Sequence, residues 1–268
     1  MSIRMSSVLT AVFLSMSLCS CIKEKREFCP CFLSVDFSGI DKGKSDSLHL
    51  GVFLPDDILC VEKLCNDSYG NRFCLEVPKG AVRLSVFSFS PVKDAFSWNL
   101  YEDGQGTSMR IPYGCECPPV YTHFAQIDTR KESHTEYVSP LKNFCSLSVL
   151  FRTDFPSLYR ISVQGNVCGY GNDGTLVDGD FIFSTVTDDE GRFSVRIPRQ
   201  KDGSLCLLID DNGGIVRKFP LGDYLLQSGY DWSEPSLRDA DVVIDYATAE
   251  IAILVNEWEY VFNAEVLI

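Results

Sequence analysis

Apolar and polar residues alternate along most of the chain from Phe32 onward, in runs of about five to eight positions. This period of two is typical of strands that bury one face and expose the other. Helical periodicity is nearly absent, and only residues 221–227 and a stretch near 55–64 resemble single helical turns. Strands are expected at residues 32–37, 48–54, 73–77, 82–89, 120–127, 145–151, 159–167, 181–186, 193–197, 205–210, 215–219, 242–246, 251–255 and 258–266.

Turn residues separate these runs and indicate two domains. Pairs such as Asp173-Gly174 and the run Asp189-Glu190-Gly191 suit the backbone angles of tight hairpins. About fourteen short strands are too many for one seven-stranded sandwich and fit two. A polar run at 128–134 precedes the expected boundary, so we expect an N-terminal β-sandwich at 29–138 and a C-terminal β-sandwich at 139–268.

The first twenty residues resemble a lipoprotein signal peptide. Arg4 provides a positive charge, and the apolar run at 8–18 is too short to span a membrane. Leu18 at position −3 and Ser20 at −1 form the recognition site for a signal peptidase that cuts before Cys21, whose thiol receives the lipid. Two alternatives, an ordinary secretory signal and lipidation of Cys19, agree less well with the residues around the expected cut. Residues 21–28 would then be a lipidated tether, and several acyl chains on Cys21 would hold the chain on a membrane.

Ten cysteines remain after Cys19 and Cys21 are set aside. In an oxidising compartment such thiols usually pair, so all ten are candidates for disulfides. Seven lie before residue 120 and three after 140, so either one bridge joins the two halves or two thiols stay free. Two C-x-C pairs at 29–31 and 115–117 match zinc spacing poorly, and we expect no metal. The candidates are Cys29, Cys31, Cys60, Cys65, Cys74, Cys115, Cys117, Cys145, Cys168 and Cys206.

Charge and missing motifs exclude several functions. The chain has 24 Lys and Arg against 37 Asp and Glu, a net charge of −13, which argues against nucleic-acid binding. There is no nucleophile elbow, HExxH helix or Gly-rich phosphate loop, and we expect no cofactor and no enzyme activity. A glycosidase carboxylate pair brought together by folding would leave no linear signature.

Scattered polar and aromatic residues leave two alternatives open. His49, His123 and His134 lie in no metal or nucleophile motif, and the acidic loops lack calcium-binding spacing. Three tryptophans and eleven tyrosines would suit either a sandwich core or a carbohydrate-binding platform.

Several segments together resemble one family. The lipobox and Cys29-Pro-Cys31 before the first strand are similar to the start of FimB-like fimbrial anchor subunits, the fimbrillin-like minor-subunit lipoproteins of Bacteroidales. The similarity is strongest from about residue 139 onward. It rests there on the segments 166–170 (NVCGY), 193–200 (FSVRIPRQ), 219–224 (FPLGDY), 228–232 (SGYDW) and 239–246 (DADVVIDY), followed by an apolar strand with Trp258.

This resemblance implies an all-β fold of two tandem transthyretin-like (Greek-key) sandwich domains. It also implies a minor subunit, lipid-anchored in the outer membrane at the base of a fimbria, that joins fimbrillin-type subunits by β-strand exchange. The apolar run 251–268 is either the exchanged strand or an internal core strand. The alternative function is a cell-surface adhesin or glycan-binding lipoprotein on the same fold, because fold alone does not decide function.

Overall fold

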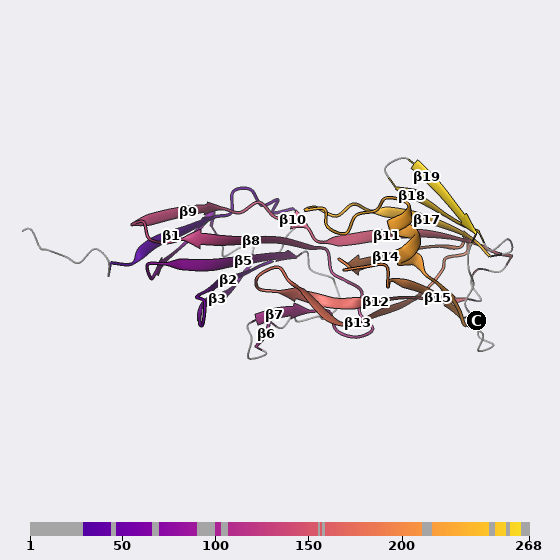
Figure 1. The fold of residues 1–268 in the computed structure, drawn as a ribbon, viewed down its shortest axis with the longest axis horizontal. Coiled ribbons are helices and arrows are strands. Elements are labelled where there is room, and N and C mark those ends of the chain that lie inside the picture. Colours follow the sequence, from indigo (N-terminus) through magenta and orange to yellow (C-terminus); the bar gives the residue numbers. More distant parts are fainter. Residues whose placement is uncertain are drawn as a thin grey trace, which may run out of the picture.

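The computed structural model shows an elongated all-β molecule in which two sandwiches lie end to end (Figure 1). The all-β expectation is therefore confirmed. The structure describes residues 29–43, 47–65, 70–89, 100–102, 107–154, 156, 159–210, 216–246, 250–255 and 258–263.

The first sandwich consists of two sheets packed around one core. Leu33 and Val35 from the first sheet meet Leu50 and Leu84 from the second, all at most 1% exposed. The first sheet has the order β4-β1-β9, with β4 at Arg72–Val77, β1 at Cys31–Asp36 and β9 at Ser133–Tyr137. The second has the order β10-β8-β5-β2-β3, with β10 at Leu141–Lys142, β8 at Val120–Asp128, β5 at Ala81–Phe89, β2 at Ser47–Phe53 and β3 at Ile58–Cys65.

The second sandwich has a larger core and carries the helix α2, Leu221–Gln227. One sheet has the order β14-β11-β17-β18-β19, with β14 at Arg192–Pro198, β11 at Phe144–Arg152, β17 at Ala240–Asp245, β18 at Glu250–Val255 and β19 at Trp258–Asn263. The other has the order β16-β15-β12-β7-β6, with β16 at Val216–Phe219, β15 at Cys206–Asp210, β12 at Arg160–Gly171, β7 at Thr107–Arg110 and β6 at Leu100–Glu102, while β13 at Leu176–Val186 also pairs with β12.

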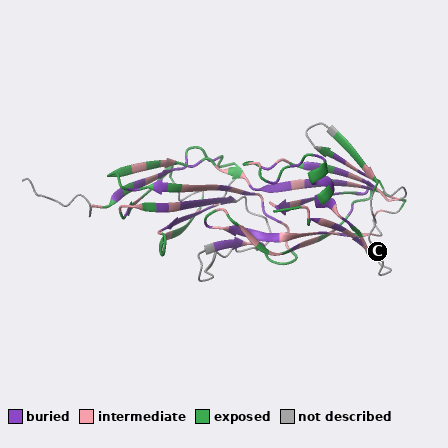
Figure 2. Cartoon of the chain, in the orientation of Figure 1, coloured by how far each residue is buried: buried purple, intermediate pink, exposed green. Residues whose placement is uncertain are grey.

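Alternation in the sequence explains which faces are buried (Figure 2). On β11, Leu147, Val149 and Phe151 enter the core while Ser148 stays exposed. The single helical turn expected at 221–227 is confirmed as α2. The helical turn expected near 55–64 is wrong, because residues 58–65 pair with β2 as strand β3. Tertiary pairing along that sheet edge overrides the local pattern.

Chain crossings tie the two sandwiches together. β5 and β8 are neighbours in the first sandwich, yet β6 and β7, which lie between them in sequence, join β12 in the second. In the other direction, the turn that connects β12 to β13 reaches the first sandwich, where Gly174 lies against the Phe124 ring and Asp173 is 3.9 Å from Arg83. The second sandwich thus includes strands that come before residue 138 in the sequence, where the domain boundary was expected, as well as strands that come after it.

A buried polar network lies at the junction. The Arg199 Nε donates to the side-chain oxygen of Asn143 at 2.6 Å, and its Nη1 donates to the Glu234 carbonyl at 2.8 Å. The Asn143 side-chain amide donates to Thr122 of β8 at 3.2 Å, and the Tyr170 hydroxyl donates to the Asn143 carbonyl. These bonds link β8 of the first sandwich to β12 and the end of β14 in the second.

Candidate functional site

The expected lipidation site lies outside the described residues. This holds for Cys21 and for Leu18 and Ser20 at the expected cut, so lipidation stays a prediction. Within the described part of the chain, no helix has the length and apolarity needed to cross a bilayer.

The ten candidate disulfide cysteines all lie within the described residues, and no two of them are joined in the structure. The strand registers place Cys74 opposite Ser34, Cys145 opposite Ile197 and Cys206 opposite Gln164, so no cysteine in these pairs faces another. Burial raises the pKa of Cys145 to about 12, which makes it a poor nucleophile. Disulfide formation stays a prediction.

The three histidines occupy packed positions in the first sandwich. Burial, with a smaller contribution from Lys63, lowers the pKa of His49 to about 4. The Nε2 atoms of His123 and His134 each lie 3.1 Å from a different oxygen of Glu136. Across the described residues, no group of three or more His, Cys, Asp or Glu side chains is arranged to hold a metal ion.

One tryptophan side chain, that of Trp232, lies within the described part of the chain. Trp232 is buried and packs on Tyr230, with ring centroids 4.7 Å apart. Trp98 and the side chain of Trp258 lie outside the described residues. Of the aromatic residues in the expected platform, Trp232 therefore belongs to the core.

The C-terminal hairpin divides the apolar run 251–268 into an internal and an edge strand. Ile251 and Ile253 of β18 are fully buried in the second core, so β18 is a core strand of its own domain. β19 pairs with β18 on one side and is the last of the described strands in its sheet. Its Val261 is 63% exposed, while Phe262 packs against Tyr224 of α2 at 5.1 Å between ring centroids. Residues 264–268 lie outside the described residues.

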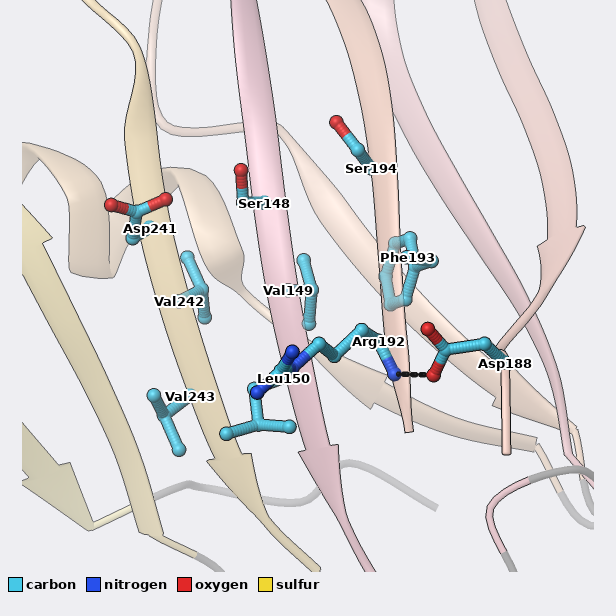
Figure 3. Close-up of a pocket in the computed structure, with 10 residues that line it drawn as sticks. All are labelled: Ser148, Val149, Leu150, Asp188, Arg192, Phe193, Ser194, Asp241, Val242 and Val243. Carbon is cyan, nitrogen blue, oxygen red and sulfur yellow. Dashed lines mark hydrogen bonds between the residues drawn. The ribbon is translucent and has the colours of Figure 1, made fainter. Parts of the chain in front are cut away.

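A hollow of about 430 Å³ lies on the outer face of the same sheet. In Figure 3, Ser148, Leu150, Asp241 and Val243 project from β11 and β17, and the Arg192 side chain extends from β14 toward Leu150. The lining residues are Ser148, Val149, Leu150, Asp188, Arg192, Phe193, Ser194, Asp241, Val242 and Val243.

Sequence reasoning missed this face. Polar residues at alternate positions of 145–151 and 242–246 indicated an exposed side for each strand. They did not indicate that β17 lies parallel to β11 and next to it. In this register each β11 residue faces a residue 93 positions later in the chain, as Ser148 faces Asp241, and β14 lies on the other side of β11. Neighbouring strands that are remote in sequence leave no local signal.

Solved structures of fimbrial, adhesin and polysaccharide-binding candidates from Bacteroidales share this architecture over most of the chain. The fimbrial anchor protein Mfa2 from Porphyromonas gingivalis matches with a TM-score of 0.62 at 12% identity, covering 86% of this chain and 99% of that one. The chain has the fold of a fimbrial anchor protein. Because the identity is low, this likeness establishes the fold alone.

Two further structures show the same likeness. A candidate adhesin from Bacteroides ovatus matches with a TM-score of 0.61 at 13% identity, covering 88% of this chain and 96% of that one. A candidate polysaccharide-binding protein from Bacteroides thetaiotaomicron matches with a TM-score of 0.61 at 14% identity, covering 87% and 98%. No protein-family model matches the sequence, and no curated protein matches it.

Proposed function

We propose that this protein is a membrane-anchored minor fimbrial subunit, which attaches a fimbria to the outer membrane and takes part in its assembly by β-strand exchange. The observation that carries the proposal is the likeness to the anchor protein Mfa2, which extends over nearly the whole of both chains. A lipobox at the N-terminus of this chain adds the membrane attachment that an anchor needs. Each sandwich would be a transthyretin-like domain, and the chain would not be an enzyme.

The shape of the molecule suits an anchor. β1 begins ten residues after Cys21. Since an extended chain spans at most about 3.5 Å per residue, the tether could hold the first sandwich within about 35 Å of the lipid. β18 and β19 belong to the second sandwich, which lies toward the opposite end of the molecule (Figure 1). The anchored end and the C-terminal hairpin would therefore be separated by the length of both domains.

The edge strand β19 supports the strand-exchange part of the proposal. An edge strand has backbone N–H and C=O groups on one side without a neighbouring strand, and such an edge can pair with an extended segment of another protein. Many edges are protected by charge or by short length, and β19 carries one charged residue, Glu259, beside an exposed valine and a partly exposed Tyr260. β19 would thus be the contact with a fimbrillin-type subunit.

A cell-surface adhesin is the second candidate. The fold match to a candidate adhesin has nearly the same TM-score as the match to the anchor protein, so fold does not separate the two functions. An adhesin would need a ligand-binding surface but no stable contact with fimbrial subunits. Co-purification from the native membrane distinguishes them.

The test is a pull-down of the tagged lipoprotein from its native membrane, with wild type compared with a deletion of residues 257–268. This deletion removes β19 but keeps the buried Ile251 and Ile253, so the core can persist. We expect fimbrial subunits with wild type and few with the deletion. Circular dichroism must first show that the variant keeps its strand content. A folded deletion that retains the subunits would exclude β19 as the contact, and a wild type that captures none would contradict the anchor function.

A further inference from the structure

An apolar row crosses the outer face of the sheet β14-β11-β17-β18-β19. In the strand registers Leu150 lies opposite Val243, Val243 opposite Ala252, and Ala252 opposite Val261. These four side chains share the face away from the core, because their neighbours along each strand, such as Val149, Val242 and Ile251, are buried. The hollow in Figure 3 lies at the Leu150–Val243 end of the row.

The positions on either side of this row are mostly polar. One flanking set consists of Ser194, Ser148, Asp241, Leu254 and Glu259, and the other consists of Arg152, Asp245, Glu250 and Asn263. Along β11, β17 and β19, polar and apolar residues therefore alternate on the outer face, whereas on β18 the apolar Leu254 follows Ala252. Across the strands, from β11 to β19, the surface stays apolar.

The direction of the row determines which secondary structure fits it. A strand laid parallel to β11 would meet Ser148, Leu150 and Arg152 in turn, and only one of these is apolar. An α-helix laid across the strands would place one stripe of its residues along the apolar row and its two sides over the flanking polar positions. Three strand spacings of about 4.8 Å make the row about 14 Å long, which matches about nine or ten helical residues. The 5–6 Å between helix positions i and i+4 is close to the strand spacing.

Charge determines the composition of that helix. The face and its rim hold three arginines, Arg152, Arg192 and Arg196. Arg192 is paired with Glu190 at 3.0 Å, and Arg196 is paired with Glu116. The carboxylates of the face include Asp188, Asp241, Asp245, Glu250 and Glu259, so it is acidic around an apolar centre. A second copy of the chain, with a net charge of −13, would be repelled, and so would an anionic lipid surface.

We propose that this outer face is a docking site for a basic amphipathic α-helix of a partner protein, whose aliphatic residues lie along Leu150, Val243, Ala252 and Val261 and whose Lys or Arg residues reach the flanking carboxylates. Helix-in-groove recognition of this kind uses apolar anchors at positions i, i+3 or i+4 and i+7. The site is independent of the edge pairing of β19, because it uses side chains on the sheet face and not backbone groups.

The test measures binding of a synthetic amphipathic helix of about 15 residues, long enough to be partly helical alone. It carries leucines at i, i+3, i+4 and i+7 with lysines beside them, and is titrated by fluorescence anisotropy into residues 22–268, the chain without its signal peptide and lipidation cysteine. Reference peptides replace every lysine by glutamate or scramble the order. Val261→Ser and Asp241→Lys alter the face. Val186→Ser and Asp180→Lys are matched controls on β13, where Val186 is also 63% exposed.

We expect the lysine peptide to bind more tightly than about 1 mM and the glutamate and scrambled peptides to bind at least tenfold more weakly. Val261→Ser should weaken binding about fivefold and Asp241→Lys about tenfold, with the β13 controls unchanged. Equal binding of the glutamate peptide, equal losses in the controls, or no binding of the lysine peptide would overturn the proposal. Two other results would also overturn it. One is binding of the chain to phosphatidylglycerol vesicles that is lost in Val261→Ser, and the other is a dimer in ultracentrifugation that is lost in the same variant.

Discussion

A fragment that begins at residue 139 should be much less stable than the same sandwich in the full chain. This fragment contains β11 to β19, but it lacks β6 and β7, which pair with the end of β12. Its core also loses Met109, Ile111 and Cys117, each at most 4% exposed. The backbone bond from the Ile111 N–H to the Cys168 carbonyl, 2.7 Å long, would be lost as well.

The expected loss is a large part of the stability of a domain. Burial of a Met or Ile side chain contributes about 1.5–3 kcal/mol, so loss of Met109 and Ile111 removes about 3–6 kcal/mol. Loss of Cys117 and of the strand pairing adds to this. A whole domain is stable by only about 5–15 kcal/mol. We therefore expect the fragment to be partly unfolded, or to unfold at a much lower urea concentration than the intact chain.

The assay is urea denaturation followed by circular dichroism, together with hydrogen exchange on two matched variants of the full chain. Met109→Ala and Leu84→Ala each remove a side chain that is 1% exposed, and each should cost about 2–5 kcal/mol. Met109→Ala should lower protection in β11 and β15, and Leu84→Ala in β2 and β8. A fragment as stable as the intact sandwich, or loss of protection confined to the first sandwich in Met109→Ala, would refute the reasoning.

Three further predictions concern single side chains. The pKa of His49 is about 4 in the folded protein and about 6.5 when unfolded, so the unfolded state gains a proton first as pH falls. Stability should fall by up to about 3 kcal/mol between pH 6.5 and 4, and the decrease should be smaller in His49→Gln, measured by urea titration at each pH. Arg199→Ala should cost about 2–4 kcal/mol by calorimetry because it leaves the Asn143 oxygen buried without its donor, and Arg199→Lys should not restore it. The exposed thiol of Cys74 should react with a thiol reagent in the folded protein, whereas the buried Cys145 should react only after unfolding; equal rates would contradict the structure.

The local pattern of polar and apolar residues predicts the regular strands well. It fails where the pairing partner of a segment determines its secondary structure. Alternation identified β11 and β14 because each buries one face of a single sandwich. It missed β3 because every residue of this edge strand is exposed or half-exposed, so no buried face imposes an alternation of polar and apolar residues. It also predicted no strand at β6 or β7, and their pairing in the second sandwich depends on contacts with β12 more than 50 residues away.

The docking face illustrates the same limit. Each of its strands was expected, and the exposed side of each could be read from alternate residues. The apolar row exists only because the registers of four strands bring Leu150, Val243, Ala252 and Val261 into line. Register is set by the folded sheet as a whole, so a single strand does not reveal it.

The anchor function is tested most directly by where fimbriae are found when the lipid attachment is removed. Cys21→Ala should leave both sandwiches intact, because β1 begins ten residues later. In the native bacterium, immunoblots of cells and culture medium would follow this protein and the fimbrial subunits, with Cys19→Ala as the matched control. We expect Cys21→Ala to release the protein from high-salt-washed membranes and to shift fimbriae into the medium, while Cys19→Ala behaves as wild type. Fimbriae that stay on cells whose lipoprotein has lost its membrane attachment would contradict the account.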